Sequence, residues 1–469
     1  MSTREFHIYN CLDAMACLEA FYPIMQEIQK ENNLDAYDSA VSLLYPLMAM
    51  QYRGMRFDNE GIARENEQAE ARIAELQEKV DTIAERKLNV NSSKQLQQYF
   101  YQELGLQPYT NRGTGNVSTD EEALIRIARK GYKEAALILE IRQIRKLKSA
   151  YLDVKLDADG RLRGSADPAG TSTGRLAVRK TQEGTGLNTQ TLPHSLYPYI
   201  LADEGYILYS IDGSQAENRM VAYIAPEPAM ILAFENKVDI HKQTASLIYN
   251  KPIEEIEYEE RQWGKKSNHG LNYGLGYRSF SLIHRIPESF AKWVVESYHR
   301  AYPGVRQWHE NIKRELSASR TLTNLFGRGR HFYDRWGEDL FKDAYSYVPQ
   351  STVAEMINRR TILYSYYTQE MKIIDLLNNM HDGLWFQIPL SAGLEVHERC
   401  LRNLRASFEA PLKYKAYEFH IPLTCSAGFN LGDRDEKNLN GQVDINWDEP
   451  LVPQLQAILG GKENEQQTV

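Results

Sequence analysis

Four residues spaced at intervals of four could together bind a charged, ring-bearing ligand. Arg261, Lys265, His269 and Tyr273 recur every fourth residue, and a glycine-rich segment follows them. On a helix, residues four apart lie on nearly the same face, so these side chains would form a slanted stripe ~18 Å long. Two cations, an imidazole and a phenol suit a nucleoside triphosphate, whereas a solvated basic face would explain only Arg261 and Lys265.

Two aspartates stand where a buried core would not place a charge. Asp212 ends the apolar run 206–211, and Asp382 sits at the tip of the apolar hairpin pattern 379–388. Taken alone, each is an ordinary turn residue. On adjacent strand ends they could hold two Mg²⁺ ions, because hard divalent cations prefer carboxylate and carbonyl oxygens; Mn²⁺ can substitute. Two such ions ~3.5–4 Å apart would activate an attacking 3′-oxygen and neutralise leaving pyrophosphate.

The elements that must position these residues follow from periodicity. Residues 62–83 carry one apolar stripe and predict a long amphipathic helix, with a second helix capped at Ser92 or Ser93. Ser118 with Glu121, or the pair one residue later, predicts a capping box. The first 150 residues therefore read as mostly helical.

Glycines break up the chain after residue 151, and a buried strand is expected at residues 206–211. Helical patterns return over residues 228–371, and residues 379–388 read as a hairpin that turns at Asp382-Gly383. The polar tail from Gly460 is expected to be disordered.

The composition is that of a multidomain globular protein with 469 residues and a formal net charge of −8. No apolar run is long enough to span a membrane, and no signal peptide opens the chain. The four cysteines form neither a metal-spaced pair nor a disulfide framework, which favours a reducing, cytosolic setting. Ten Lys or Arg against four Asp between residues 142 and 180 could contact a phosphate backbone, or could line a solvated helix face.

The sequence resembles the DNA polymerase I family, family A, from about residue 22 onward. Residues 210–219 (SIDGSQAENR) are similar to the family's D-Y-S-Q-I-E-L-R motif, and residues 261–274 to R-x-x-x-K-x-x-x-F/Y-x-x-x-Y-G. Residues 380–383 (MHDG) resemble V-H-D-E. Weaker likenesses follow in order: TSTGRL with LNTQTLP to the family's primer–template segment, D-I-H at 239–241, and VPQST at 348–352.

The resemblance implies roles for individual residues. Asp212, the Gly213 carbonyl and Asp382 would be metal ligands, with Asp212, Asp382 and Lys265 the catalytic residues. Glu217 would exclude a ribose 2′-hydroxyl. The implied nucleotide-binding residues are Arg261, Lys265, His269, Tyr273, His241, Gln215 and Glu217. The implied DNA contacts are Arg175, Asn188, Gln190, Gln350 and His381.

Three departures from the family pattern change these expectations. Position 269 is His where the family has Phe or Tyr, so dideoxynucleotide discrimination does not carry over. Gly383 replaces a second acidic residue, so the metal site depends more heavily on Asp212 and Asp382. The insertion 177–186, with Arg179 and Lys180, is longer than the family's usual link and offers an added DNA contact.

The N-terminus is similar to the end of the family's 3′→5′ exonuclease domain, because Tyr9 and Asp13 match its Y-x-x-x-D motif. An ordinary helix start would also fit this pattern. No other exonuclease carboxylates precede it, so we expect no proofreading on this chain. A separate exonuclease subunit, or loss of that domain, would follow, and a phage origin would suit the split arrangement and place the protein in the host cytoplasm.

The expected fold is an α+β right hand with an antiparallel-sheet palm, helical fingers and a helical thumb. The expected divisions are an exonuclease remnant (1–22), thumb (23–155), palm (156–230), fingers (231–349), palm again (350–459) and tail (460–469). The expected function is primer extension with deoxynucleotides on a DNA template in replication, with no membrane partner. The alternatives are a single-subunit RNA polymerase, which shares the D-G-S sequence at 212–214, and a non-catalytic DNA-binding protein.

Overall fold

A five-stranded antiparallel sheet forms the base of the molecule. The computed structural model of the chain describes residues 3–111 and 115–466. The sheet has the order β13-β12-β5-β9-β8, and every neighbouring pair is antiparallel. Its strands are β5 (Tyr206–Gly213), β8 (Asp375–Met380), β9 (Gly383–Pro389), β12 (Leu423–Gly428) and β13 (Val443–Asp444). The expected antiparallel palm, with the 379–388 hairpin beside the 206–211 strand, is confirmed.

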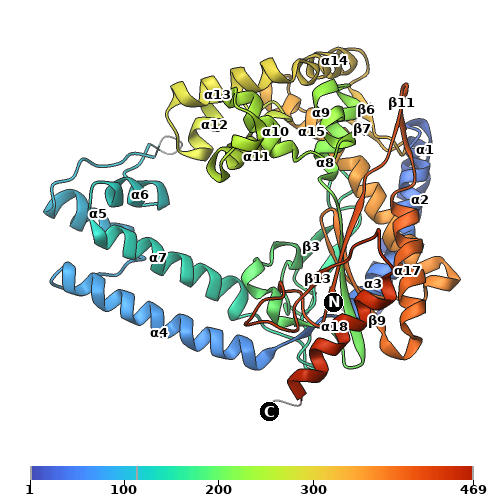
Figure 1. Ribbon diagram of the computed structural model, residues 1–469, viewed down its shortest axis with the longest axis horizontal. Helices are drawn as coiled ribbons and strands as arrows, with labels where there is room; N and C mark the ends of the chain where they lie inside the picture. The colour runs from blue at the N-terminus through green and yellow to red at the C-terminus, as the bar shows by residue number, and fades with distance from the viewer. Residues whose placement is uncertain (1–2, 112–114, 467–469) are drawn as a thin grey trace.

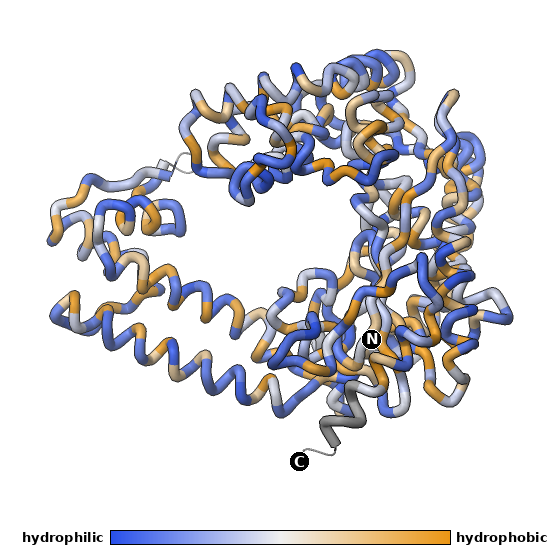
Figure 2. The backbone as a smooth tube through the Cα atoms, viewed as in Figure 1, coloured by the Kyte–Doolittle hydropathy of each residue, from blue (hydrophilic) through white to orange (hydrophobic). Residues whose placement is uncertain are grey.

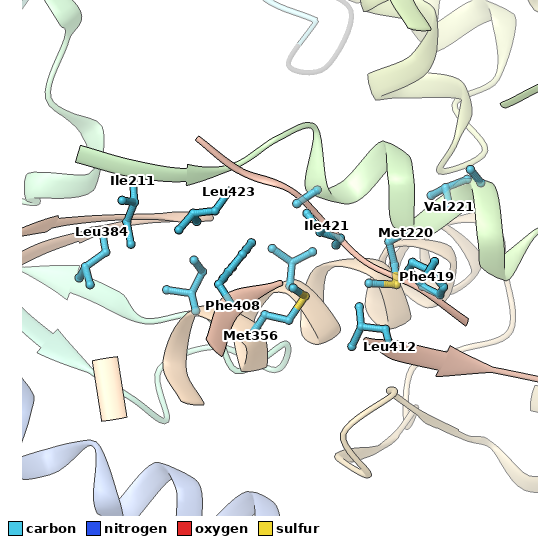
Figure 3. Close-up of a cluster of buried hydrophobic side chains, with 14 of the residues drawn as sticks. Ile211, Met220, Val221, Met356, Leu384, Phe408, Leu412, Phe419, Ile421 and Leu423 are labelled. Atoms are coloured by element: carbon cyan, nitrogen blue, oxygen red, sulfur yellow. The ribbon is translucent and has the colours of Figure 1, made fainter. Parts of the chain in front are cut away.

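One face of this sheet packs on helices, because successive side chains of β5 point to opposite faces and every second one is apolar and buried in the main core. Ile207, Tyr209 and Ile211 join the main core, whereas the alternate residues Ser210 and Asp212 face away from it. Figure 3 shows Ile211 beside Leu384 of β9, with helical side chains packed below them. The covering helices are α8 (Ala216–Ile224), α15 (Glu338–Ile357), α17 (Leu394–Phe408) and α18 (Leu451–Gln466).

The thumb is a helical arm with its own core. Helices α4 (Asn59–Ile83) and α7 (Lys133–Leu147) run side by side away from the sheet, on the left of Figure 1. Smaller elements close its far end: α5 (Ser93–Gln97), the π-helix Gln98–Glu103 and α6 (Glu121–Arg129). Hydrophilic and hydrophobic residues alternate along α4 and α7 (Figure 2), as expected for helices that bury one stripe. The predicted amphipathic helix over 62–83 is confirmed.

The thumb begins later than residue 23. Helix α1 (Thr3–Lys30) buries no residue, while α2 (Leu34–Ser42) and α3 (Leu44–Arg53) lie against the palm. Leu47 and Met50 join the main core of the palm and fingers, because the apolar face of α3 packs on β8. The thumb core starts with α4, whereas we expected the thumb to start at residue 23.

The fingers are helical and lie across from the thumb (Figure 1). Their helices are α9 (Pro228–Glu235), α10 (Ile240–Tyr249), α11 (Tyr258–Leu271), α12 (Tyr277–His284), α13 (Glu288–Ala301) and α14 (Pro303–Ser319). A small hairpin, β6 (Thr321–Thr323) and β7 (Gly329–His331), follows. The expected boundary between fingers and palm at 349/350 falls inside α15, because this one helix packs on both regions.

Three local expectations need correction. The N-cap of α6 is Asp120, which accepts from the backbone NH of Ala123, and Ser118 instead accepts from the NH of Asp120. The β8–β9 turn is His381-Asp382, since Gly383 already pairs with Met380. Helix α18 continues past Gly460 to Gln466, because the polar residues after Gly460 include good helix formers that extend a helix already begun.

Short paired segments and single turns complete the chain. The remaining strands are β1 (Arg56–Phe57) with β4 (Ile200–Leu201), β2 (Ser165–Asp167) with β3 (Ala177–Arg179), and β10 (Leu412–Tyr414) with β11 (Tyr417–Phe419). The insertion that we expected at 177–186 thus begins as strand β3. Across the part of the chain that the structure describes, no helix is long and apolar enough to cross a bilayer.

Candidate active site

The two aspartates lie on adjoining strands of the sheet. Asp212 pairs in register with Gly383, next to Asp382 in the β8–β9 turn. The backbone NH of Gly213 donates to the carbonyl of Asp382 at 3.1 Å, and the Thr424 hydroxyl donates to the carbonyl of Asp212 at 3.0 Å. Backbone hydrogen bonds therefore fix the two acidic residues relative to one another. The predicted meeting of Asp212 and Asp382 is confirmed.

The electrostatics of this pair are those of two like charges held close together. Partial burial, and then the charge of Asp382, raise the pKa of Asp212. Burial also raises the pKa of Asp382, and the Glu217 carboxylate adds to the shift while Arg175 and His381 oppose it. A cation between the carboxylates would relieve this repulsion. No cluster of three or more His, Cys, Asp or Glu residues suited to a metal occurs among the described residues, so a metal here would rely on these two side chains.

Gly383 occupies a position where a side chain does not fit. A Cβ built there would lie 2.7 Å from the backbone oxygen of Ile211 and 3.1 Å from Oδ1 of Asp212. The first distance is shorter than ordinary van der Waals contact, and a strand backbone cannot yield as a flexible side chain can. The family's acidic residue at this position would therefore require the β8–β9 hairpin to shift away from β5.

Most of the predicted stripe lies on α11. Arg261, Lys265 and His269 are on this helix, which begins with a capping box formed by Glu257 and Glu260. The periodicity had predicted Tyr273 on the same helix. The helix ends at Leu271, however, so Tyr273 lies in the following turn. Gly274 (φ +74°) makes that turn possible, since the left-handed region favours glycine.

Helix α10 packs closely against α11 and places His241 near His269. The ring centroids of the two histidines are 5.8 Å apart. Gly264 permits the approach, because a Cβ there would lie 2.0 Å from the carbonyl oxygen of His241. Arg261 Nε donates to Asp239 Oδ2 at 2.7 Å, and Asp239 also caps α10. Sequence reasoning missed Gly264 and the role of Asp239; the N-cap signal of an Asp before a helix could have found the latter.

Glu217 connects the palm to the turn after α11. It forms an ion pair with Arg175, and the Tyr273 hydroxyl donates to its Oε2. Arg175, predicted as a DNA contact, is therefore engaged by an acidic neighbour in this structure. Gln215 precedes α8 in the left-handed region (φ +50°), and its Oε1 is buried without a hydrogen-bond partner within the described chain. Such strain and an orphan acceptor are typical of functional sites.

The other predicted DNA contacts lie in different environments. Gln190 is buried, and its side-chain NH₂ donates to Asn379 Oδ1 at 3.0 Å, which ties its loop to β8. Asn188 caps the short 3₁₀ turn Thr189–Thr191. Gln350 lies half-buried in α15, and His381 is exposed at the hairpin tip with φ +53°.

The basic stretch from 142 to 180 is largely used inside the protein. Arg142 donates to the carbonyls of Val90 and Thr119, which holds the thumb together. The cations that form ion pairs with carboxylates are Lys148, Arg161, Arg163, Arg175 and Arg179. Within the described residues, the cations of this stretch whose side chains make neither an ion pair nor a hydrogen bond are Arg145, Lys146, Lys155 and Lys180. The expected phosphate-binding surface is therefore smaller than the sequence suggests.

Comparison with known proteins identifies the chain's relatives. Residues 59–433 match the model of a family described as "DNA polymerase family A". DNA polymerase I of Helicobacter pylori (strain ATCC 700392 / 26695) is 26% identical over 396 residues, which cover 81% of this chain and 42% of that protein. Thermostable DNA polymerase I of Thermus aquaticus is 29% identical over 360 residues, covering 73% and 42%.

A solved structure shares the fold. The POL domain of Pol1 from M. smegmatis, in complex with DNA primer-template and dNTP, superposes with a TM-score of 0.76 at 24% identity, covering 86% of this chain and 72% of that one. The expected right-hand fold is confirmed by this likeness. The chain spans less than half the length of the curated relatives named above.

Proposed function

Because the chain belongs to DNA polymerase family A, we propose that it is a template-directed DNA polymerase that acts in replication. It extends the 3′ end of a primer with deoxynucleotides by nucleotidyl transfer. The observation that carries this proposal is the juxtaposition of Asp212 and Asp382 on adjoining strands. Burial and Lys265 lower the pKa of His269, and the carboxylates of Glu217 and Asp382 oppose this shift. This interaction of an α11 residue with two palm carboxylates supports a single site between palm and fingers.

Two divalent cations, Mg²⁺ or Mn²⁺, fit the donor set at the sheet. Asp212, Asp382 and the carbonyl of Gly213 would hold them, since these are the hard oxygen ligands that such ions prefer. When bound, the ions would supply activation of the attacking 3′-hydroxyl and charge neutralisation of the leaving pyrophosphate. The electrostatics of the pair support the assignment, because burial raises the pKa of both carboxyls and the charge of Asp382 adds to the shift at Asp212.

The chain's own residues then bind and orient the substrates. Arg261 and Lys265 attract the triphosphate, and His269 offers its ring to the incoming nucleotide. Glu217, which Arg175 and Tyr273 hold in position, excludes a nucleotide that carries a 2′-hydroxyl. The proposed DNA contacts are Arg175, Asn188, Gln190, Gln350 and His381, with primer–template DNA as the partner. Such a substrate also favours the cytoplasm as the compartment.

Primer extension on a defined template tests the proposal. The assay compares deoxynucleotides with ribonucleotides for the wild type, Asp212→Asn and Asp444→Asn. Asp444 is a matched control, because it is an exposed carboxylate of the same sheet that bonds Ser426. We expect deoxynucleotide extension in the wild type and the control, with loss in Asp212→Asn. Efficient ribonucleotide use would favour an RNA polymerase, and DNA binding without extension would favour a non-catalytic protein.

We also propose that a separate protein, an exonuclease subunit, binds helix α1 and that this chain does not proofread. Nine large apolar side chains of α1 are 45–62% exposed: Phe6, Ile8, Tyr9, Leu12, Met15, Leu18, Phe21, Tyr22 and Ile24. Such continuous apolar exposure is typical of an interaction surface. Tyr9 and Asp13 lie one turn apart on this helix.

Mismatched-primer excision and co-purification from the source test this pair of statements. We expect no 3′ excision by the pure chain. We expect the partner to co-purify with the wild type and to be lost from a Leu12→Glu, Leu18→Glu variant that still extends primers. Excision by the pure chain, or equal recovery of an exonuclease with both forms, would contradict the proposal.

A further inference from the structure

A buried amide on α11 faces the imidazole of His241 on α10. Asn268 is fully buried, and its Nδ2 lies 3.0 Å from His241 Nδ1. The carbonyl oxygen of Ile240 is 3.5 Å from the same Nδ2, and Thr244 Oγ1 lies 3.0 Å from Oδ1. In the structure the amide lies with its NH₂ toward the histidine and its oxygen toward Thr244, whose hydroxyl also contacts the Ile240 carbonyl at 2.7 Å and the Tyr302 hydroxyl at 2.9 Å.

This orientation determines where the histidine carries its proton. An amide NH₂ can only donate, so Nδ1 of His241 must accept and cannot be protonated. Burial lowers the pKa of His241 to about 4; Asp239 opposes this shift, and His269, Arg261 and Lys265 add to it. The ring is therefore neutral at pH 7, with its single proton on Nε2. Nε2 makes no hydrogen bond within the described chain. It is also not one of the fully buried polar atoms that lack a partner, so it is available to a ligand.

Three contacts hold His241 to α11. Besides Asn268, these are the close packing of Gly264 on the His241 carbonyl and the ion pair between Asp239 and Arg261. If α11 moves when a nucleotide binds, His241 moves with it and keeps its position relative to the cations of the same helix.

We propose that Asn268 is a positioning residue, which holds His241 in the Nε2–H form so that it donates a hydrogen bond to a phosphate oxygen of the incoming nucleotide. The inference rests on the proposed function for the identity of the ligand. The opposite tautomer would present a nitrogen lone pair to an anionic oxygen, which repels it. Asn268 thus selects a donor without adding a third positive charge to Arg261 and Lys265.

The tautomer itself can be measured in the free protein, without any polymerase assay. Long-range ¹H–¹⁵N NMR of histidine-labelled protein at pH 7 distinguishes protonated from unprotonated ring nitrogens, with His241→Gln used to assign the signal. We expect an unprotonated Nδ1 and a protonated Nε2 in the wild type, and a tautomer mixture in Asn268→Leu. His397 is an internal reference, since Tyr209 and the Pro389 carbonyl fix its ring independently. A protonated Nδ1 in wild-type His241 would overturn the proposal, even if Asn268→Leu failed to fold.

Two substitutions of His241 test the donor role. The amide nitrogen of Gln can occupy the place of Nε2 and donate, whereas Phe keeps the ring shape and donates nothing. We expect the KM for deoxynucleotides to rise about tenfold more in His241→Phe than in His241→Gln, the size of one lost hydrogen bond to a charged group. Equal KM values would overturn the donor role. Absence of extension by the wild type would instead count against the proposed function and leave the NMR result standing.

Discussion

The palm and the fingers position their functional groups by different means. In the palm, Asp212 and Asp382 are set by the hydrogen-bond register of β5 against β9 and by one further backbone bond from Gly213. In the fingers, His241 and Arg261 are set by side-chain contacts with Asn268 and Asp239. The register of a sheet can change only by whole residues, whereas individual side-chain contacts can weaken one at a time. Damage in the palm should therefore be nearly complete, and damage in the fingers graded.

The largest effect is expected from neutralising a palm aspartate. Asp212→Asn should lower the extension rate by about 10³-fold, because divalent cations lose a charged ligand. The same change should raise the Tm at pH 7 without metal. An acid whose folded-state pKa is raised destabilises the fold above its unfolded pKa, so removing the charge removes that cost. Rate measurements and thermal melts check both results, and a lower Tm would contradict the account of the repulsion. Mg²⁺ should raise the Tm of the wild type more than that of the variant.

A methyl group at the strand pairing should have the next largest effect. In Gly383→Ala, the new Cβ meets the Ile211 backbone oxygen, so the hairpin that carries Asp382 must shift. We expect a loss of about 1–3 kcal/mol of stability and a rate at least about tenfold lower. Gly460→Ala is the matched control, because nothing lies within 4 Å of a Cβ there. Chemical denaturation and single-turnover extension make the comparison, and equal behaviour of both variants would show that the register tolerates the displacement.

The contact between the two regions should govern sugar selection more than rate. Glu217→Ala removes the carboxylate held by Arg175 and Tyr273 and should reduce deoxynucleotide preference over ribonucleotides by about 10²-fold. Tyr273→Phe, which loses only the hydroxyl, should cause a smaller reduction of about tenfold. The ratio of kcat/KM values for the two sugars measures both. Unchanged selectivity in Glu217→Ala would remove this residue from the proposed role.

The smallest effect is expected in the fingers. Asp239→Asn keeps a good N-cap for α10 but removes the ion pair with Arg261, in which both side chains are about a third exposed. We expect the KM for deoxynucleotides to rise about threefold with little change in kcat. The difference from the wild type should shrink as salt is added, because exposed charges are screened. A loss as large as that of Asp212→Asn would contradict the distinction between the two regions.

Sequence reasoning was most successful where a local pattern and its structural consequence coincide. The short apolar run of residues 206–211 predicts a buried strand, and the amphipathic stripe of residues 62–83 predicts a helix; both are present. It was less successful where a local signal competes with a contact between residues far apart in the chain. Asp-Gly was expected to form the turn at 382–383, but the long-range pairing of Asp212 with Gly383 moves the turn one residue back. The packing of α3 on β8, between the expected thumb start at residue 23 and α4, is likewise not a local property that the sequence pattern could indicate.

The sequence by itself determined the family, the nature of the two acidic residues and the cations and rings of the α11 stripe, because these depend on residue type and spacing. Only the tertiary structure decided which neighbours surround each predicted site residue. It pairs Arg175 with Glu217, buries Gln190 against β8, uses most cations of the 142–180 stretch internally and sets Asn268 against His241. These outcomes depend on contacts between residues far apart in the chain. Such a contact alters the charge, exposure or tautomer of a side chain, and the local sequence around that residue carries no sign of it.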